Sequence, residues 1–371
     1  MIRIVHMIGS LEAGGSQKII IDIYKGIDKS KFQFDFIAHD DSTYYEEEIK
    51  NMGGRIFRVP RFKGYNIREV IKAWNNLFSA HPEWQIFHSH VRSYASVLIP
   101  IAHKHGLKTV IHSHNISNGK GVKNCIKTFL QFPLKYQADY FLACSKAAGL
   151  WIFGKNVVNS NQFRVLKNGI DVKKFIYNEN KRCEMRLKFN LGDSLVLGNV
   201  GRLVEQKNQK FLLDIFGSFV KLVPNAKLLI IGSGNLKSAL VAKAQSLNII
   251  DNIVWISNTK NVNDFYQAMD CFVFPSLWEG LGIVLIEAQI NGLPCFVFDN
   301  IPEEADLKIK KMNYFNLAET NEAWADKIYS CLLSGNKRNI NGEVVAKNEG
   351  YVLSDTISSL SNVYESLLHD K

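Results

Sequence analysis

Two glutamates and two cations stand where their side chains could do chemistry. Glu279 and Glu287 lie eight positions apart in a segment that otherwise reads as buried. Burying a carboxylate without a partner is costly, so each glutamate needs a group to bind. Arg202 and Lys207 lie five positions apart, just after another apolar segment. A planar guanidinium and a compact ammonium could together hold a diphosphate, although two solvated surface cations are the ordinary alternative.

Four histidines fall at the ends of two apolar segments, and they are His88, His90, His112 and His114. In a strand, a spacing of two places both members of each pair on one face. Imidazoles could ligate a metal ion, but no Asp or Glu companion is fixed nearby and no Asp-x-Asp sequence occurs. We therefore expect no metal, and a satisfied core residue is the ordinary interpretation of any single histidine.

Glycine turns follow two further apolar segments. Gly14 and Gly15 come after residues 2–7 and before a helical pattern, where bare backbone N–H groups would suit a phosphate. Gly232 and Gly234 follow residues 227–231 in the same way. Neither turn matches the Gly-x-Gly-x-x-Gly or P-loop sequence, and a tight turn needs no ligand, so each is weak evidence by itself.

Short apolar segments that alternate with helical patterns must position these residues. The expected strands are 2–7, 34–38, 86–90, 109–114, 140–145, 195–200, 227–231, 253–256, 271–274 and 295–298. Such alternation predicts parallel sheets covered on both faces. The pattern restarts near Asp193, after the charged stretch Glu179–Lys188, which we interpret as a linker. We expect an α/β protein with two doubly wound, Rossmann-like domains facing a cleft, and ligands beyond the carboxyl ends of the strands.

Length and composition narrow the possible classes of protein. A chain of 371 residues favours two domains. Residues 1–180 have a net charge of +11 and residues 181–371 a net charge of −1, which suggests an anionic partner for the first half. No apolar run reaches the roughly 18 residues of a membrane span, and the first residues read as a strand instead of a signal peptide. With scattered cysteines as well, we expect a cytoplasmic protein with reduced thiols.

Taken together and in this order, the motifs resemble those of the retaining glycosyltransferases of family 4, which have the GT-B fold. The most specific part begins at Pro275-Ser, contains both glutamates and ends at Gly292-Leu-Pro294. Looser matches are Gly14-Gly15, His114, Asn168-Gly-Ile-Asp171, Arg202 with Lys207, and Gly232-Ser-Gly234. Lys167 replaces a usual proline. Residues 299–304 replace a common glycine-rich turn, as in capsule and exopolysaccharide members, which leaves the donor sugar open.

The resemblance implies roles for individual residues. Arg202 and Lys207 would neutralise the leaving diphosphate, while Glu287 would hold the ribose and Glu279 the donor sugar. The implied donor-binding residues are Gly15, Arg202, Lys207, Gly232, Glu279, Gly280, Leu281, Gly282 and Glu287. The implied catalytic residues are His114, Glu279, Arg202 and Lys207, and the implied acceptor-side residues are His90, His112 and Asn115. We favour His114 over His112 because it lies nearer the strand's end. The resemblance implies no metal or other cofactor.

The resemblance also implies an organisation and an activity. We expect an acceptor-binding domain at 1–180, a nucleotide-sugar-binding domain at 181–354, and a C-terminal helix at 355–371 that packs back on the first domain. The expected reaction transfers a hexosyl or N-acetylhexosaminyl group from a UDP-sugar to a lipid-linked oligosaccharide in bacterial surface polysaccharide synthesis. A nucleotide-sugar epimerase on the same fold and a non-catalytic sugar-binding protein are the alternatives. We expect no nucleic-acid partner.

One basic stretch of the first domain mixes lysines with apolar residues, and it spans residues 119–136. Lys120, Lys123, Lys127 and Lys135 alternate there with Ile126, Phe129, Leu130 and Phe132. Such a helix can lie in the headgroup plane of an anionic membrane, with its lysines on the lipid phosphates. We therefore expect peripheral attachment to the inner face of the cell membrane. The alternative is that the apolar face packs on the sheet.

Overall fold

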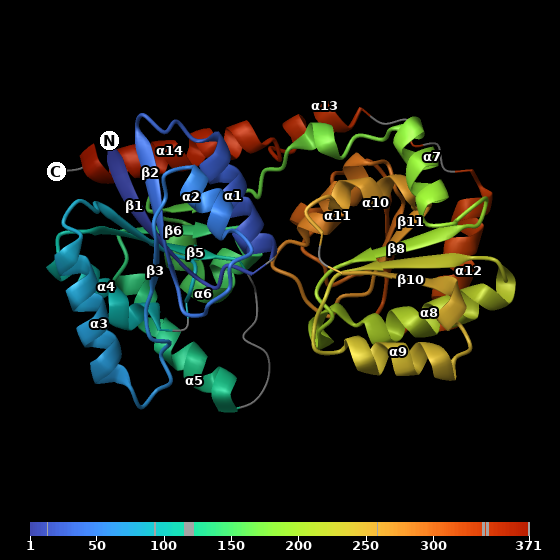
Figure 1. Cartoon of the computed structure of the whole chain (residues 1–371), viewed down its shortest axis with the longest axis horizontal. Coiled ribbons are helices and arrows are strands. Elements are labelled where there is room, and N and C mark those ends of the chain that lie inside the picture. Colours follow the sequence, from blue (N-terminus) through green and yellow to red (C-terminus); the bar gives the residue numbers. More distant parts are fainter. Residues whose placement is uncertain are drawn as a thin grey trace. The chain divides into compact units, whose positions relative to one another are not determined.

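The chain folds into two α/β units, which are described separately (Figure 1). The structure is a computed structural model that describes residues 1–12, 14–92, 94–114, 122–257, 259–335, 338 and 341–369. The N-terminal unit comprises residues 1–170 and 352–371, and the C-terminal unit comprises residues 171–351. The boundaries expected from the sequence lie at 180 and 354, so the structure divides the chain earlier at both places.

The N-terminal unit is built on a seven-stranded parallel sheet with the order β3-β2-β1-β4-β5-β6-β7. Its strands are β1 (Ile2–Gly9), β2 (Phe32–Ala38), β3 (Ile56–Arg58), β4 (Ile86–Ser89), β5 (Lys108–Ser113), β6 (Tyr140–Ala143) and β7 (Phe163–Val165). The strand order reverses between β1 and β4. In doubly wound sheets, ligands bind at this reversal, beyond the carboxyl ends of the strands.

Helices cover both faces of this sheet because its side chains alternate between the two faces. The helices are α1 (Gly15–Gly26), α2 (Glu46–Asn51), α3 (Ile67–Ala80), α4 (Ala95–Lys104), α5 (Val122–Gln131), the 3-10 helix η1 (Phe132–Tyr136), α6 (Lys146–Val158) and α14 (Leu353–His369). Ile4 and Ile8 of β1 share a core with α1, α2 and α14, whereas Val5 and Met7 share one with α3 and α4. None of the helices described in either unit has the length and apolar character that crossing a membrane requires.

The last helix, α14, returns to the N-terminal unit, as expected. Leu360, Val363, Tyr364 and Leu367 are buried in the core beside α1, and Figure 1 shows the helix in red along this unit. The start of α14 is fixed by the motif at Asn168, because Gly169 N–H donates to Thr356 Oγ1 at 3.0 Å. A side chain at position 169 would collide with the backbone of Val352 and Leu353, so close packing explains why this residue is a glycine.

The C-terminal unit contains a six-stranded parallel sheet with the order β10-β9-β8-β11-β12-β13. Its strands are β8 (Val196–Val200), β9 (Lys227–Ile231), β10 (Ile253–Ile256), β11 (Cys271–Phe274), β12 (Cys295–Phe298) and β13 (Met312–Phe315). Its helices are η2 (Val172–Lys174), α7 (Glu179–Lys188), η3 (Glu205–Lys207), α8 (Gln209–Leu222), α9 (Lys237–Ser246), η4 (Ile250–Asn252), α10 (Val262–Ala268), α11 (Ile283–Ile290), η5 (Glu303–Ala305), α12 (Asn321–Leu333) and α13 (Gly342–Asn348). Helices α8, α9 and α12 share one core with the sheet, and α10 and α11 lie on the other face (Figure 1).

All ten strands expected from the sequence are present, with bounds that differ by at most two residues. Three further strands, β3, β7 and β13, were not expected. Each lies at an edge of its sheet and has three or four residues. An edge strand has one neighbour and a partly exposed face, so it can contain polar residues such as Arg58, Arg164 and Asn313, and no continuous apolar run marks it.

The prediction of a linker at Glu179–Lys188 was wrong, because this stretch forms α7 and packs on α10. The Asn178 side chain caps the helix by accepting from the Lys181 backbone N–H at 2.9 Å. The many charges that suggested a linker instead attach the helix to the sheet. Arg182 Nη2 lies 2.6 Å from Asp270 Oδ1, immediately before β11, and Arg186 forms a second ion pair with the same carboxylate.

Candidate active site

The connection between β8 and α8, at the carboxyl edge of the C-terminal sheet, carries both predicted cations. β8 leads through Gly201 to Arg202, and η3 ends at Lys207. Strand order reverses between β8 and β11, so both cations follow the strand at the expected ligand edge. The Arg202 side chain is exposed and forms no ion pair with any residue that the structure describes. Its guanidinium is therefore available to an anion from solution.

Lys207 is held by a buried glutamate from the next loop. Its Nζ atom lies 2.6 Å from Glu279 Oε1, and the two side chains are 14% and 8% exposed. The same ammonium lies 4.7 Å from the centre of the Phe274 ring, a favourable cation–π contact. Glu279 thus has the partner that its burial requires. The structure thus places Lys207, which is predicted to bind the diphosphate, in contact with Glu279, which is predicted to bind the donor sugar.

The turn after β11 is anchored to η3 by backbone contacts. Gln206 Nε2 donates to the Trp278 carbonyl at 2.7 Å, and the Leu277 N–H donates to the Gln206 carbonyl at 2.9 Å. The turn ends at Gly282, whose φ of +84° is strained for any residue with a side chain. Gly282 caps α11, and the first N–H groups of a helix have no partner within the helix. Gly280 and Leu281 are buried, so the turn would meet a ligand mainly through backbone groups.

The second glutamate, Glu287, lies on α11 and is 3% exposed. The Tyr266 hydroxyl of α10 donates to Glu287 Oε2 at 2.9 Å. Burial and the nearby Glu287 carboxylate raise the pKa of Tyr266 well above its usual value, so the phenol keeps its hydrogen. Glu287 is therefore a buried carboxylate with a fixed orientation, positioned by a tyrosine that the sequence analysis did not identify.

Gly232 and Gly234 lie where the loop after β9 packs on the loop after β8. A side chain at Gly232 would come within 2.1 Å of the Gly201 carbonyl, and one at Gly234 within 2.3 Å of the Leu203 carbonyl. The Leu203 N–H also donates to the Ser233 carbonyl at 2.8 Å. Close packing explains both glycines, so Gly232 supports the loop that carries Arg202 whether or not it also meets a ligand.

Gly15, the predicted phosphate-binding position of the N-terminal unit, is the first residue of α1. It follows Gly14, which is extended, and it lies beyond the carboxyl end of β1. The first turn of α1 contains no acidic side chain that would compete for its N–H groups. This arrangement suits an anion at the helix N-terminus.

The four predicted histidines lie together on the face of the N-terminal sheet that α1 and α14 cover. His88 of β4 and His112 of β5 are buried, whereas His90 and His114 follow these strands and are half-buried. The ring centres of His88 and His90 are 4.3 Å apart, and those of His112 and His114 are 4.0 Å apart. Asn115, predicted on the acceptor side, lies outside the described residues.

These imidazoles are neutral at physiological pH because burial disfavours their charged form. Burial, with Arg92 adding to the effect, lowers the pKa of His114 to about 3. Burial and the neighbouring rings lower the pKa values of His88, His90 and His112 well below 6.5. A neutral imidazole has one donor and one acceptor, so each ring can bind an uncharged polar group such as a hydroxyl.

Sequence analysis missed a fifth histidine of this cluster, His6 of β1. It also missed Tyr364, whose hydroxyl contacts the cluster at His88. His6 is buried, and its register partner on β4 is His88. His88 Nδ1 lies 2.6 Å from the Tyr364 hydroxyl of α14. His6 stood out in the sequence as a polar residue in the first apolar segment. Its proximity to the other histidines could not be predicted, because it depends on β1 lying beside β4.

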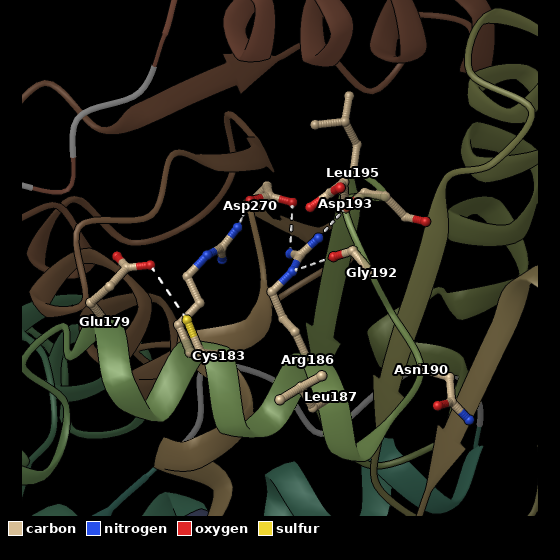
Figure 2. Close-up of a pocket in the computed structure, with 11 residues that line it drawn as sticks. Glu179, Cys183, Arg186, Leu187, Asn190, Gly192, Asp193, Leu195 and Asp270 are labelled. Carbon is tan, nitrogen blue, oxygen red and sulfur yellow. Dashed lines mark hydrogen bonds and ion pairs between the residues drawn. The ribbon is translucent and has the colours of Figure 1, made fainter.

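A surface hollow of about 750 Å³ lies at the opposite, amino edge of the C-terminal sheet (Figure 2). Its two arginines are engaged with one aspartate and with backbone carbonyls. Arg182 and Arg186 both contact Asp270, and Arg186 Nε also donates to the Gly192 carbonyl at 2.9 Å. None of the predicted site residues lines this hollow, and we assign its residues to the attachment of α7.

The chain matches two family descriptions. "Glycosyl transferases group 1" matches residues 181–370, and "Glycosyltransferase Family 4" matches residues 13–174. EpsF of Bacillus subtilis (strain 168), a protein named as a glycosyltransferase, is 29% identical over 369 residues, which are 98% of this chain and 96% of EpsF. The UDP-Gal:alpha-D-GlcNAc-diphosphoundecaprenol alpha-1,3-galactosyltransferase of Escherichia coli is 27% identical over 317 residues, which are 80% of this chain and 79% of that enzyme.

The fold is similar to that of HepE from Anabaena, solved in complex with UDP and glucose. The TM-score is 0.82 with 14% sequence identity, and the match covers 99% of this chain and all of the HepE chain. This match confirms the expected fold of two Rossmann-like domains. The helix α14, as part of the N-terminal unit, confirms the expected return of the C-terminus.

Proposed function

The chain belongs to the group 1 glycosyl transferases, and from this membership we propose that it transfers a sugar from a UDP-sugar to a lipid-linked oligosaccharide, with retention at the anomeric carbon. The product would be a bacterial surface polysaccharide. The observation that carries the proposal is the contact between Lys207 and Glu279 at the carboxyl edge of the second sheet, with Arg202 exposed nearby in the chain.

In the proposed complex, Arg202 and Lys207 neutralise the diphosphate as the sugar leaves. Two protein cations would supply the charge stabilisation that a divalent metal supplies elsewhere. The anion would approach Lys207 next to Glu279, so the ammonium would be shared between a carboxylate and a phosphate oxygen. The Gly15 N–H would assist from the start of α1.

Two glutamates hold the sugars in this proposal. Glu287, oriented by Tyr266, accepts hydrogen bonds from the ribose hydroxyls, and Glu279 accepts from a hydroxyl of the transferred sugar. Gly280, Leu281 and Gly282 contribute backbone N–H groups before α11. Support for a UDP-sugar comes from the Escherichia coli relative, whose name specifies UDP-Gal, and from HepE, which was solved with UDP.

Retention would follow from attack on the same face that the diphosphate leaves. The departing phosphate oxygen would take the proton of the acceptor hydroxyl, so no protein base is needed. His114 would contact the transferred sugar as a neutral group, which agrees with its lowered pKa. His90, His112 and Asn115 remain proposed for the acceptor side.

A lipid-linked acceptor is supported by the name of the same relative, which specifies a diphosphoundecaprenol-linked sugar. An aromatic patch at the end of α5 and along η1 fits a membrane surface. Phe129, Phe132 and Tyr136 are 79%, 60% and 74% exposed, so these side chains do not pack on the sheet. Lys135 Nζ lies 4.2 Å from the Phe132 ring centre. We propose that this patch and the nearby lysines dock on anionic lipids.

Vesicle sedimentation tests this docking surface. The protein should pellet with vesicles rich in phosphatidylglycerol, and binding should fade as salt rises. Lys127→Glu with Lys135→Glu should weaken binding. A charge-matched control in the C-terminal unit, Lys210→Glu with Lys327→Glu, should not. Wild-type protein that stays in the supernatant at low salt would oppose docking and favour a soluble acceptor. Lys120 lies outside the described residues.

A panel of radiolabelled UDP- and GDP-sugars, with and without lipid-linked acceptors, tests the activity itself. Transfer should require both a nucleotide sugar and an acceptor, and the product should keep the anomeric configuration of the donor. Conversion of a nucleotide sugar without an acceptor into its epimer would favour the epimerase. Binding without any turnover across the panel would favour a non-catalytic sugar-binding protein.

A further inference from the structure

Three histidines of the N-terminal unit form a hydrogen-bonded row. His6 Nδ1 lies 3.1 Å from His90 Nε2, and His90 Nδ1 lies 2.9 Å from His114 Nε2. The ring planes at these two links differ by only 13° and 23°, and the ring centres lie 5.4 Å and 5.1 Å apart. Each centre-to-centre distance exceeds the nitrogen–nitrogen distance by about one ring diameter. The linked nitrogens therefore face each other in nearly common planes.

This geometry favours hydrogen bonds over a metal site. Nitrogens of His6, His88 and His90 lie within 4.8 Å of one another, as do those of His90, His112 and His114. A metal needs ring lone pairs that converge on one point about 2.0–2.1 Å away. The in-plane lone pairs of His6, His90 and His114 point along the row, and His88 stacks its face on His90 with planes 22° apart. In the second group only His112 is tilted, by 44° from His90 and 35° from His114. One tilted ring does not bring three lone pairs to a single point.

A row of neutral imidazoles has only two arrangements of its hydrogens. Each ring has one N–H and one acceptor nitrogen, so every link must be N–H to N, and one link fixes the next. In the outward arrangement, His6 Nδ1–H donates to His90 and His90 Nδ1–H donates to His114, which leaves a hydrogen on His114 Nδ1. In the inward arrangement, the spare hydrogen lies on His6 Nε2.

The surroundings of its two ends favour the outward arrangement of the row. The nitrogens at both ends, His6 Nε2 and His114 Nδ1, are buried and have no partner among the described protein atoms. His6 borders a cavity of about 10 Å³, lined otherwise by three neighbouring imidazoles and by the apolar side chains Ile19, Ile20, Ile23, Phe34, Leu166 and Leu360. An unpaired N–H is rarer inside proteins than an unpaired acceptor. The outward arrangement leaves only a bare acceptor nitrogen at His6. It places the unpaired N–H on His114 Nδ1, where β5 ends and a ligand at that edge of the sheet can accept from it.

We propose that His90 and His6 are positioning residues that hold His114 as a neutral hydrogen-bond donor, with its Nδ1 hydrogen presented to an oxygen atom of the donor sugar. The identity of that oxygen rests on the proposed function, whereas the direction of the row does not. The row does not lead protons to solvent, because its inner end borders only a cavity of about 10 Å³ that is lined by other imidazoles and by apolar side chains. It selects a substrate group that accepts a hydrogen bond over one that only donates.

Nitrogen-15 spectra of the histidine rings, recorded on tag-free, substrate-free protein near neutral pH, test the direction. The ring of His114 should carry its hydrogen on Nδ1. His90→Phe keeps an aromatic ring but removes both nitrogens, so His114 should become a mixture of tautomers. His112→Phe, a matched change at a buried histidine outside the row, should leave the His114 tautomer unchanged. His90→Gln can still accept and donate, so it should restore most of the Nδ1 tautomer.

Kinetics separate this inference from the proposed function. Once the donor is known, His90→Phe should slow transfer by about three- to tenfold, the value of one neutral hydrogen bond, and His90→Gln should recover part of the loss. A hydrogen on Nε2 of wild-type His114, or a tautomer unaffected by His90→Phe, would overturn the inference. One equivalent of tightly bound transition metal would also overturn it. Correct tautomers with no turnover of any nucleotide sugar would refute only the proposed function.

Discussion

Lys207 Nζ and Glu279 Oε1 are 2.6 Å apart in the C-terminal unit, although 72 positions separate them in the chain. The contact joins the loop after β8 to the turn after β11, on either side of the point where the strand order reverses. It gives the buried glutamate a partner and fixes the ammonium at the ligand edge. The pair thus links the stability of the unit to the proposed donor site.

Removing one member of this pair should be more harmful to stability than removing both. Lys207→Met leaves the Glu279 carboxylate buried without its cation and should cost about 3–5 kcal/mol of unfolding free energy. Lys207→Met combined with Glu279→Leu replaces the pair by apolar groups and should recover most of that loss. Urea unfolding measures both values. If Lys207→Met alone is as stable as the wild type, the ion pair contributes nothing to the stability of the fold.

Stability should fall as the pH drops from 7 to 5.5 because five histidines, three buried and two half-buried, are held as neutral rings. Burial lowers the folded pKa of His6 and His114 to about 3, and it lowers those of His88, His90 and His112 well below 6.5. The unfolded chain therefore binds protons first. The histidine contribution is complete above about pH 6.5 and is lost as the pH falls towards the folded pKa values, at up to about 1.4 kcal/mol per pH unit for each ring.

Urea midpoints at pH 7.0, 6.25 and 5.5 measure this slope. His112→Phe removes one buried ring that titrates on unfolding. The number of protons taken up on unfolding, which sets the slope of stability against pH, should fall by up to one. His369→Gln, a change at an exposed position, should leave it unaltered. A wild-type slope near zero over this range would mean that the rings are protonated in the folded protein, which would contradict their neutral row.

The last helix should be required for a stable N-terminal unit. A chain that ends before Asp355 loses the buried side chains of Leu360, Val363, Tyr364 and Leu367, each of which contributes about 1.5–3 kcal/mol when fully buried. Thermal melting should lose its cooperative transition or shift far downward. A chain that ends at Leu368 keeps these contacts and serves as the control. An unchanged melting temperature in the shorter chain would contradict the packing of α14.

Transfer should survive a strong chelator. Arg202 and Lys207 supply two positive charges for the diphosphate, and the sequence contains no Asp-x-Asp pair that would hold a divalent ion. Transfer rates measured with excess EDTA, and again after Mg²⁺ or Mn²⁺ is restored, should agree within about twofold. Complete loss of activity that a divalent ion restores would refute metal independence and would make the histidine cluster a candidate for the ligands.

The strands were predictable because each central strand is buried on both faces and is therefore mostly apolar, with polar exceptions such as Asp35 and His88. Edge strands such as β7, with Arg164 at its centre, lack that signal. The charges of α7 resembled a linker because their partner, Asp270, follows 84 positions after Arg186. Sequence reveals the composition of a segment but not the distant side chain that neutralises it.

The candidate site divides in the same way. The family resemblance of the motifs predicted roles for Arg202, Lys207, Glu279 and Glu287. The structure brings Lys207 and Glu279 into contact, and the roles themselves stay predictions. The row from His6 to His114 could not be read from spacing, because it depends on β1 and β4 being neighbours in the sheet. Tyr266 was missed for a similar reason, as it reaches Glu287 from a different helix.

The most direct test of the central claim measures UDP binding by titration calorimetry, because it needs neither the sugar nor the acceptor to be known. Wild-type protein should bind UDP, and Arg202→Ala and Lys207→Ala should each weaken binding at least tenfold. The same variants should slow transfer at least tenfold, a loss on the order of 2–4 kcal/mol. Lys210→Ala removes an exposed lysine just beyond the site and should bind UDP like the wild type. Equal UDP affinity in all four proteins, or no binding at all, would contradict the account.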